Sequence, residues 1–327
     1  LLINAIPTVV AGVTIATSYV VGSRRCIDAA WADMRTGLWF AVTRFGLLHY
    51  VDSRQHLRNW RPVLLVLVGS PGTRQQMLRF AHGLESGRGL LFLAQIITGP
   101  WEELLARQHR VQGALRTFIR DNELSAVAKT VIADDFEHGV ATLLQVTGVG
   151  EFQPNTVMVG WSDDVLKREG FSGAIRRVLQ LEQNLIVFQE AEAAARLEPT
   201  IDVWWYSREN GSFMSTLAYL LNTNEDWKRH TIRILRIIRD EGGVDDAKAG
   251  TEDVLADLRI PAEVIVLVSE EPPLDVIAAT SESAAVCFVG MSLVDSEENP
   301  LDQYATLVER LRGNIFLAKS WHDLNRE

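Results

Sequence analysis

NWRPVLLVLVGSPG, at Asn59–Gly72, contains six consecutive apolar residues between a proline and a glycine-rich turn. A short run of valine and leucine bounded in this way is typical of a strand that is buried on both faces of a parallel sheet. The glycines and Pro71 that follow the run indicate a tight turn into the next element. The stretch therefore predicts the first strand of an α/β domain.

Similar short runs recur toward the C-terminus and alternate with longer amphipathic segments, which is the pattern of βα units around a parallel sheet with right-handed crossovers. The ten runs form two sets of five, which predicts two α/β subdomains, each with a mostly parallel five-stranded sheet flanked by helices. We place the subdomains at residues 61–198 and 199–327. The predicted strands are Val63–Gly69, Leu90–Ile97, Val127–Ala133, Thr156–Gly160, Leu185–Gln189, Ile201–Tyr206, Thr231–Ile238, Glu263–Val268, Ala284–Gly290 and Asn314–Ala318. The predicted helices are Arg74–Leu84, Glu102–Asn122, Phe136–Val146, Asp163–Leu181, Ser212–Leu221, Asp245–Leu258, Leu274–Ser281 and Leu301–Leu311.

The first residues of the chain differ from the rest in composition. Residues 1–22 include no charged side chain, and Arg24 and Arg25 follow directly. About 20 apolar residues suffice to cross a bilayer, and basic residues favour the cytoplasmic end of a span. We predict that residues 1–22 are the end of a last transmembrane helix and that the chain after about residue 23 lies in the cytoplasm. A buried helix of a soluble domain is the alternative.

Residues 23–60 are predicted to form a linker helix, centred on Cys26–Leu57. Apolar side chains recur there at steps of three and four, close to the 3.5-residue spacing of a seam between two helices. The alternative is that this stripe packs on its own subdomain. The candidate seam comprises Trp31, Met34, Leu38, Phe45 and Leu48, with Ala41 between them.

The charge of the chain argues against a nucleic-acid partner, and the spacing of its cysteines argues against a metal site. The 327 residues carry a formal net charge of −10, which argues against a nucleic-acid partner. The two cysteines, Cys26 and Cys287, are far apart and show no metal-ligand spacing, so we interpret them as reduced intracellular thiols. No metal site and no catalytic residue is assigned.

Six sequence blocks together resemble one protein family. They occur in the order in which the cytosolic domain of the cation-chloride cotransporters carries them, and the resemblance extends from about Ala11 to the C-terminus. The loops between them are short, which favours a prokaryotic relative within the amino acid–polyamine–organocation superfamily. The blocks are NWRPVLLVLVGSPG (Asn59–Gly72), GRGLLFLAQIITGP (Gly87–Pro100), NTVMVGW (Asn155–Trp161), IDVWWYSRENGSFMSTLAYLL (Ile201–Leu221), WKRHTIRILRI (Trp227–Ile237) and LRIPAEVIVL (Leu258–Leu267).

The resemblance implies a function and a set of partners. Members of the family are secondary transporters that move Cl⁻ together with K⁺, Na⁺ or both. Their C-terminal half consists of two subdomains similar to universal stress proteins, and it forms homodimers. The implied role is a regulatory and dimerisation domain of a cell-membrane symporter, without catalysis. Its partners are its own transmembrane domain, a second copy of itself, and the membrane through the N-terminal segment. The ion sites of the family lie in membrane helices, so no ion ligand is assigned here.

A weak candidate site for a nucleotide involves Gly69, Ser70 and Gly160. These residues follow the first and fourth predicted strands, where doubly wound sheets commonly bind ligands. The turn lacks the GK[ST] ending of a P-loop and the spacing of a dinucleotide site, so a purely structural turn is the alternative. Similarity to universal stress proteins implies a glycine-rich ATP loop after the fourth strand, but only Gly160 occupies that position. Weak ATP binding is the one cofactor candidate, and a stand-alone nucleotide-sensing universal-stress-type protein is the alternative function.

Two further clusters have both a structural and a chemical interpretation. Asp134–His138 (DDFEH) contains acids and a histidine suited to metal binding or general-base chemistry, but an acidic residue before a helix is more typical of an N-cap. Trp204 and Trp205 lie inside a predicted strand, where core packing is favoured over ligand stacking. Neither pattern supports an enzyme.

Overall fold

The computed structural model describes residues 10, 12–14, 16–17, 28–51, 60–85, 87–149, 152–192, 195–292 and 299–321. The chain divides into two compact units, Leu1–Arg54 and Gln55–Glu327, which are described separately. The predicted membrane segment, residues 1–22, lies largely outside the described residues. No helix in the described part of the chain is both long enough and apolar enough to cross a membrane.

The first unit contains helix α2 (Asp28–Val51), which lies within the predicted linker helix. Three of the seam residues, Leu38, Phe45 and Leu48, are 63%, 64% and 50% exposed. Trp31 and Met34 belong to the helix, but their side chains lie outside the described residues. Trp39 and Phe40 are also exposed, and they lie off the predicted stripe. The exposed apolar surface of α2 therefore extends beyond the predicted seam, as in helices with apolar partners on several sides.

All ten predicted strands and all eight predicted helices of the second unit are present, in the predicted order. The strands are β1 (Val63–Leu67), β2 (Leu90–Thr98), β3 (Ala126–Ala133), β4 (Thr156–Gly160), β5 (Asn184–Gln189), β6 (Glu198–Trp204), β7 (Thr231–Ile238), β8 (Glu263–Val268), β9 (Ala284–Gly290) and β10 (Asn314–Lys319). The helices are α3 (Gln75–Glu85), α4 (Trp101–Asp121), α5 (Phe136–Val146), α6 (Val165–Gln180), α7 (Arg208–Asn222), α8 (Val244–Leu258), α9 (Pro273–Thr280) and α10 (Ala305–Arg310).

The last helix is shorter than predicted. The segment expected as one helix, Leu301–Leu311, begins with a 3-10 turn at Asp302–Tyr304 and continues as α10. The buried hydroxyl of Tyr304 accepts a hydrogen bond of 2.8 Å from the backbone N–H of Ser292, just after β9. This contact fixes the turn against the end of the neighbouring strand.

The strands form one continuous sheet in the order β3-β2-β1-β4-β5-β10-β9-β6-β7-β8. Each half has the same internal order, and the halves meet where β5 pairs antiparallel with β10, so the two expected sheets are joined edge to edge. Val187 lies opposite Leu317 at the centre of this pair, and every other named strand pair is parallel. The halves are therefore related by an approximate two-fold axis through the β5–β10 pair. The expected mostly parallel α/β fold is confirmed.

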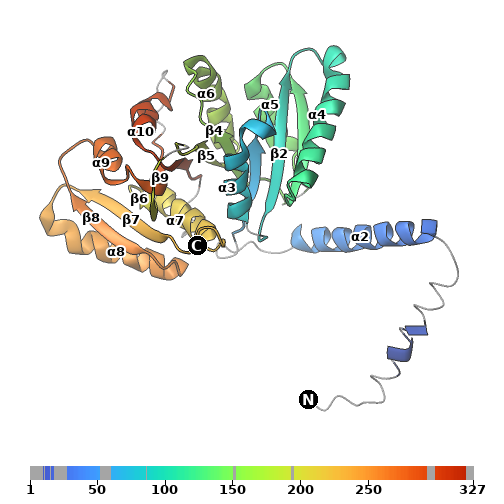
Figure 1. Ribbon diagram of the computed structural model, residues 1–327, viewed down its shortest axis with the longest axis horizontal. Coiled ribbons are helices and arrows are strands. Elements are labelled where there is room, and N and C mark those ends of the chain that lie inside the picture. Colours follow the sequence, from blue (N-terminus) through green and yellow to red (C-terminus); the bar gives the residue numbers. More distant parts are fainter. Residues whose placement is uncertain are drawn as a thin grey trace. The chain divides into compact units, whose positions relative to one another are not determined.

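Two helical layers cover the sheet of the second unit (Figure 1). Apolar residues of α3, α4, α7 and α8 form the core on one face, and those of α5, α6, α9 and α10 form the core on the other. Each core contains residues from both halves of the chain. The halves therefore share two cores as well as a sheet.

Phe316, on β10, lies at the centre of a group of aromatic rings from both halves. Its ring centroid is 5.0 Å from that of Phe188 on β5, 5.3 Å from Phe80 on α3 and 4.6 Å from Phe288 on β9. Its side chain is fully buried. Removing this ring leaves a cavity at the junction between the halves.

We expect Phe316→Ala to lower the free energy of unfolding by about 3–5 kcal/mol, because a buried aromatic side chain is replaced by a cavity. Urea unfolding followed by circular dichroism measures this change. The matched control is Val146→Ala, at a side chain that is 60% exposed, where a change within about 0.5 kcal/mol is expected. Equal effects of the two substitutions would contradict the central position of Phe316.

Candidate functional site

The sequence-predicted site residues Gly69, Ser70 and Gly160 lie at the same edge of the sheet. Strands β1 and β4 are parallel neighbours, and β1 pairs with β2 on its other side while β4 pairs with β5. The connections from β1 and β4 therefore leave in opposite directions, which is the position where open α/β sheets form a ligand crevice. Gly69 and Ser70 follow β1, and Gly160 ends β4.

The side chain of Arg74 occupies this crevice. Its Nη2 donates a hydrogen bond of 3.0 Å to the backbone carbonyl of Trp161, immediately after β4. A Cβ at Gly160 would lie 2.7 Å from the Cζ of Arg74, so Gly160 allows the guanidinium to approach the strand end closely. Sequence analysis did not identify Arg74, because nothing in the local spacing links it to Gly160.

The backbone carbonyls of Gly69 and Ser70 accept hydrogen bonds from strand β2 and from within the turn. The carbonyl of Gly69 accepts a hydrogen bond of 2.6 Å from the side-chain amide of Gln95 on β2. The carbonyl of Ser70 accepts bonds from the N–H and the hydroxyl of Thr73. Together with the 3-10 turn Pro71–Thr73, these bonds make a strand-to-helix connection of defined shape.

A cavity of 230 Å³ opens beside the same turn, but on its other side. Its walls are formed by Pro71, Gly72 and Gln95 together with apolar residues of α4, and Gly160 is not among them. The hollow next to the turn is therefore separate from the crevice between β1 and β4.

The second half of the sheet repeats this arrangement at the end of β9. The Nδ2 of Asn210, from the start of α7, donates a hydrogen bond of 3.2 Å to the carbonyl of Met291, and its Oδ1 accepts one of 2.8 Å from the N–H of Ser320. A Cβ at Gly290 would lie 3.0 Å from that Nδ2. In both crevices, a side chain therefore donates a hydrogen bond to the backbone carbonyl of the residue that follows the glycine at the strand end.

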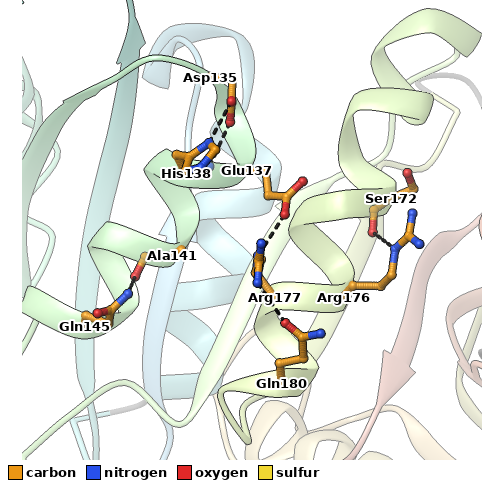
Figure 2. A network of polar contacts seen from close by, with 9 residues as sticks. All are labelled: Asp135, Glu137, His138, Ala141, Gln145, Ser172, Arg176, Arg177 and Gln180. Carbon is orange, nitrogen blue, oxygen red and sulfur yellow. Dashed lines mark hydrogen bonds and ion pairs between the residues drawn. The ribbon is translucent and has the colours of Figure 1, made fainter.

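The Asp134–His138 cluster forms a helix N-cap, as the structural interpretation predicts (Figure 2). Asp135 is the N-cap of α5 and accepts a hydrogen bond of 2.8 Å from the backbone N–H of His138. Its second carboxylate oxygen lies 2.7 Å from Nδ1 of His138. The hydrogen bonds from His138 lower the pKa of Asp135, and the hydrogen bond to Asp135 raises the pKa of His138.

Glu137, in the first turn of α5, points away from this cap toward α6 (Figure 2). It forms an ion pair of 2.8 Å with Arg177. A Cβ at Gly173 would lie 2.1 Å from the carboxylate of Glu137, so a larger residue at this position would displace the ion pair.

No group of three or more potential metal ligands is found in the described part of the chain.

Trp204 and Trp205 are buried, as core packing predicts, and belong to the cores on opposite faces of the sheet. Trp204 also belongs to a buried polar cluster that sequence analysis missed. Its indole N–H donates to the hydroxyl of Ser281, which in turn donates to Asp202 at 2.6 Å. Arg233 donates two bonds of 2.7 Å to the fully buried carboxylate of Asp202.

This cluster has the properties of a structural element. The charge of Asp202 is compensated by a bidentate guanidinium, the arrangement that a buried carboxylate requires. Cys287 lies opposite Asp202 in the register of β6 and β9, and burial raises the pKa of its thiol. A thiol in this state is a poor nucleophile. The signal that sequence analysis overlooked was the aspartate inside an apolar strand.

We expect the pKa of His138 to fall toward its ordinary value of 6.5 in Asp135→Asn. Asparagine caps a helix about as well as aspartate, so the substitution removes the charge and keeps the cap. Because the folded pKa is raised, protonated His138 contributes stability below pH 6.5, and this is lost as pH rises through the folded pKa. An NMR titration of the imidazole measures the shift, with Asp134→Asn as the control. An unchanged pKa in Asp135→Asn would contradict the pairing.

Comparison with known proteins supports the resemblance found in the sequence. Residues 74–170 match the family model for solute carrier family 12. Among solved structures, the cytoplasmic domain of a prokaryotic cation chloride cotransporter matches with a TM-score of 0.61 at 18% identity, over 81% of this chain and 99% of that chain. A universal stress protein from Archaeoglobus fulgidus DSM 4304 matches with a TM-score of 0.54 at 14% identity, over 81% of this chain and 98% of that chain.

At these identities the two solved structures show the fold alone. The fold is shared by a transporter domain and a universal stress protein, so it does not discriminate between them. The family model does, because it describes sequence and matches a segment from Arg74 into α6. The family model and the solved transporter domain thus confirm the resemblance of this chain to the C-terminal cytosolic domain of the cation-chloride cotransporters.

Proposed function

We propose that this chain is the cytosolic regulatory and dimerisation domain of a secondary transporter that cotransports Cl⁻ with K⁺, Na⁺ or both. The observation that carries the proposal is the match of residues 74–170 to the solute carrier family 12 model. The domain performs no catalysis, and its partners are its own transmembrane domain and a second copy of itself. It belongs at the cell membrane with the α/β body in the cytoplasm.

The surface of α2 supports a role in linking and dimerisation. A helix that is apolar on several sides is stable in water only when other apolar surfaces cover it. Leu38, Phe45 and Leu48 follow each other at steps of seven and three residues, so they lie on one side of the helix. In the proposed dimer this side meets its counterpart in a second copy.

The alternative function, a stand-alone nucleotide sensor, is less favoured by the contents of the crevice. The guanidinium of Arg74 lies against Gly160, so a nucleotide phosphate that approached this glycine would have to displace the bond to Trp161. The second crevice contains the buried side chain of Asn210 in the corresponding position. Weak ATP binding beside Gly69, Ser70 and Gly160 stays a proposal of lower rank.

Calorimetric titration of ATP into the chain distinguishes the two functions. We expect no saturable heat and no thermal shift at millimolar ATP, because Arg74 occupies the crevice. A ligand at 100 times its Kd would stabilise the fold by about 2.7 kcal/mol, a shift that is easily measured. Saturable binding that is abolished by Gly160→Val would instead favour the nucleotide sensor.

Phe45→Asp tests the role of α2 in the dimer. Burying a phenylalanine side chain contributes about 1.5–3 kcal/mol per copy, and an unpaired carboxylate in an apolar contact opposes association further. We expect the mutant to dissociate at concentrations at which the wild-type chain is dimeric. Light-scattering mass over a dilution series measures this, and circular dichroism verifies that the Pro62–Glu327 region stays folded.

The matched control is Thr43→Asp, which adds the same charge to the same helix. Thr43 is exposed and lies about 200° of helix rotation from Phe45, off the proposed seam. Chloride-dependent uptake of rubidium or sodium by the transporter that carries this chain should fall with Phe45→Asp and not with Thr43→Asp. A wild-type transporter without chloride-dependent uptake would overturn the proposed function, whereas equal masses for both variants would overturn only the seam.

A further inference from the structure

The two outer edges of the ten-stranded sheet differ in how their backbone groups are satisfied. Strands β3 and β8 are the end strands, and they occupy the same position in their respective halves. An end strand carries a row of backbone N–H and C=O groups that point away from the sheet, and proteins usually cover or protect such a row.

The edge of β3 is covered by helix α4. The carbonyl of Ala133 accepts a bond from Gly99, after β2, so the carbonyls of Ala128 and Thr130 point to the opposite side, outward. Gln112 donates a bond of 2.9 Å to the carbonyl of Ala128, and Gln108 donates one of 3.2 Å to that of Thr130. These outward carbonyls are thus already occupied by side chains of the chain itself.

The edge of β8 has no such cover. Ser269 donates its N–H to Ile238, after β7, so the backbone groups of Val264, Val266 and Val268 point outward. In the described part of the chain, no hydrogen bond reaches these outward groups. Helix α8 contains no glutamine, and Arg236 on β7 donates hydrogen bonds to the carbonyl of Ala247 and the hydroxyl of Thr251 on this helix. In Figure 1, β8 lies at the end of the sheet.

Charge is concentrated around this open edge. Residues 240–271 contain ten acidic and two basic side chains, a formal charge of −8 out of −10 for the whole chain. Glu263 begins β8, and Glu270 and Glu271 follow it, all three in exposed or loop positions near the ends of the strand. The strand between them, VIVLV, is apolar. The edge is thus an apolar strand with an acidic residue or pair at each end.

We propose that the open edge of β8 binds an extended, cationic peptide segment of a partner protein by β-strand addition. Backbone bonds to Val264, Val266 and Val268 would supply affinity, and lysine or arginine beside Glu263, Glu270 and Glu271 would supply selectivity. A second copy of this chain fits less well, because antiparallel pairing around Val266 brings Glu263 of one copy close to Glu270 of the other, and like charges across a strand pair are destabilising.

The probe is the labelled peptide Lys-Val-Lys-Val-Thr-Val-Arg-Val-Lys, and fluorescence anisotropy measures its binding to the purified chain. We expect saturable binding that weakens by about tenfold or more when alternate peptide nitrogens are methylated, because methylation removes the edge-facing donors and keeps the charge and side chains. Val266→Pro removes the outward N–H of β8 and leaves the bonds to β7, so it should weaken binding similarly. Thermal unfolding verifies that this variant is folded.

Charge is tested with Glu270→Lys combined with Glu271→Lys. This double variant should bind the probe several-fold more weakly at low salt, whereas Glu102→Lys with Glu103→Lys, the same change on α4, should not. The proposal is overturned if the methylated peptide binds as tightly as its parent, or if no saturable binding occurs at millimolar probe. It is equally overturned if the wild-type chain forms a dimer that Val266→Pro converts to a monomer, because the edge would then belong to a second copy.

Discussion

The antiparallel pairing of β5 with β10 is the contact on which the two-fold organisation of the α/β body depends. Each of these strands ends its half of the sheet, and unpaired it would expose a row of backbone groups between two apolar cores. Asn184, at the start of β5, accepts a bond from Trp321 after β10, and Asn314, at the start of β10, accepts one from Ala191 after β5. The two asparagines fix the register from both ends, and Phe188 lies opposite Phe316 between them.

The approximate symmetry places two crevices in the molecule, and the chain occupies both with its own side chains. Arg74 and Asn210 enter from the beginning of corresponding helices and bond the carbonyls of Trp161 and Met291. The side chains differ in charge, size and burial, but each lies against a strand-end glycine that admits it. The two crevices therefore share the way in which a side chain of the chain itself fills them. An internal side chain in this position holds the start of the helix to the end of the strand.

Much of the fold was predictable because buried parallel strands appear as short apolar runs between turn residues. The sequence pattern does not determine which strands become lateral neighbours, because side-chain alternation specifies the faces of a strand and not its edges. The joining of β5 and β10 was missed for this reason, although Asn184 and Asn314 begin otherwise apolar strands and were a usable signal. Arg74 and Trp161 are 87 positions apart, so no local spacing reveals their contact. Asp202 inside an apolar strand was an overlooked signal for a buried partner, which Arg233 on the next strand provides.

The distribution of charge explains how the sheet tolerates an uncovered edge. An apolar end strand with free backbone groups promotes association between copies unless a feature of the sequence opposes it. On β3 the glutamines of α4 occupy the outward carbonyls, but on β8 the opposing feature is electrostatic, because most of the net negative charge of the chain lies in the surrounding segment. Charge of one sign repels a second copy and attracts a segment of the opposite sign. The same acidic residues that protect the edge from self-association therefore determine which partners it can accept.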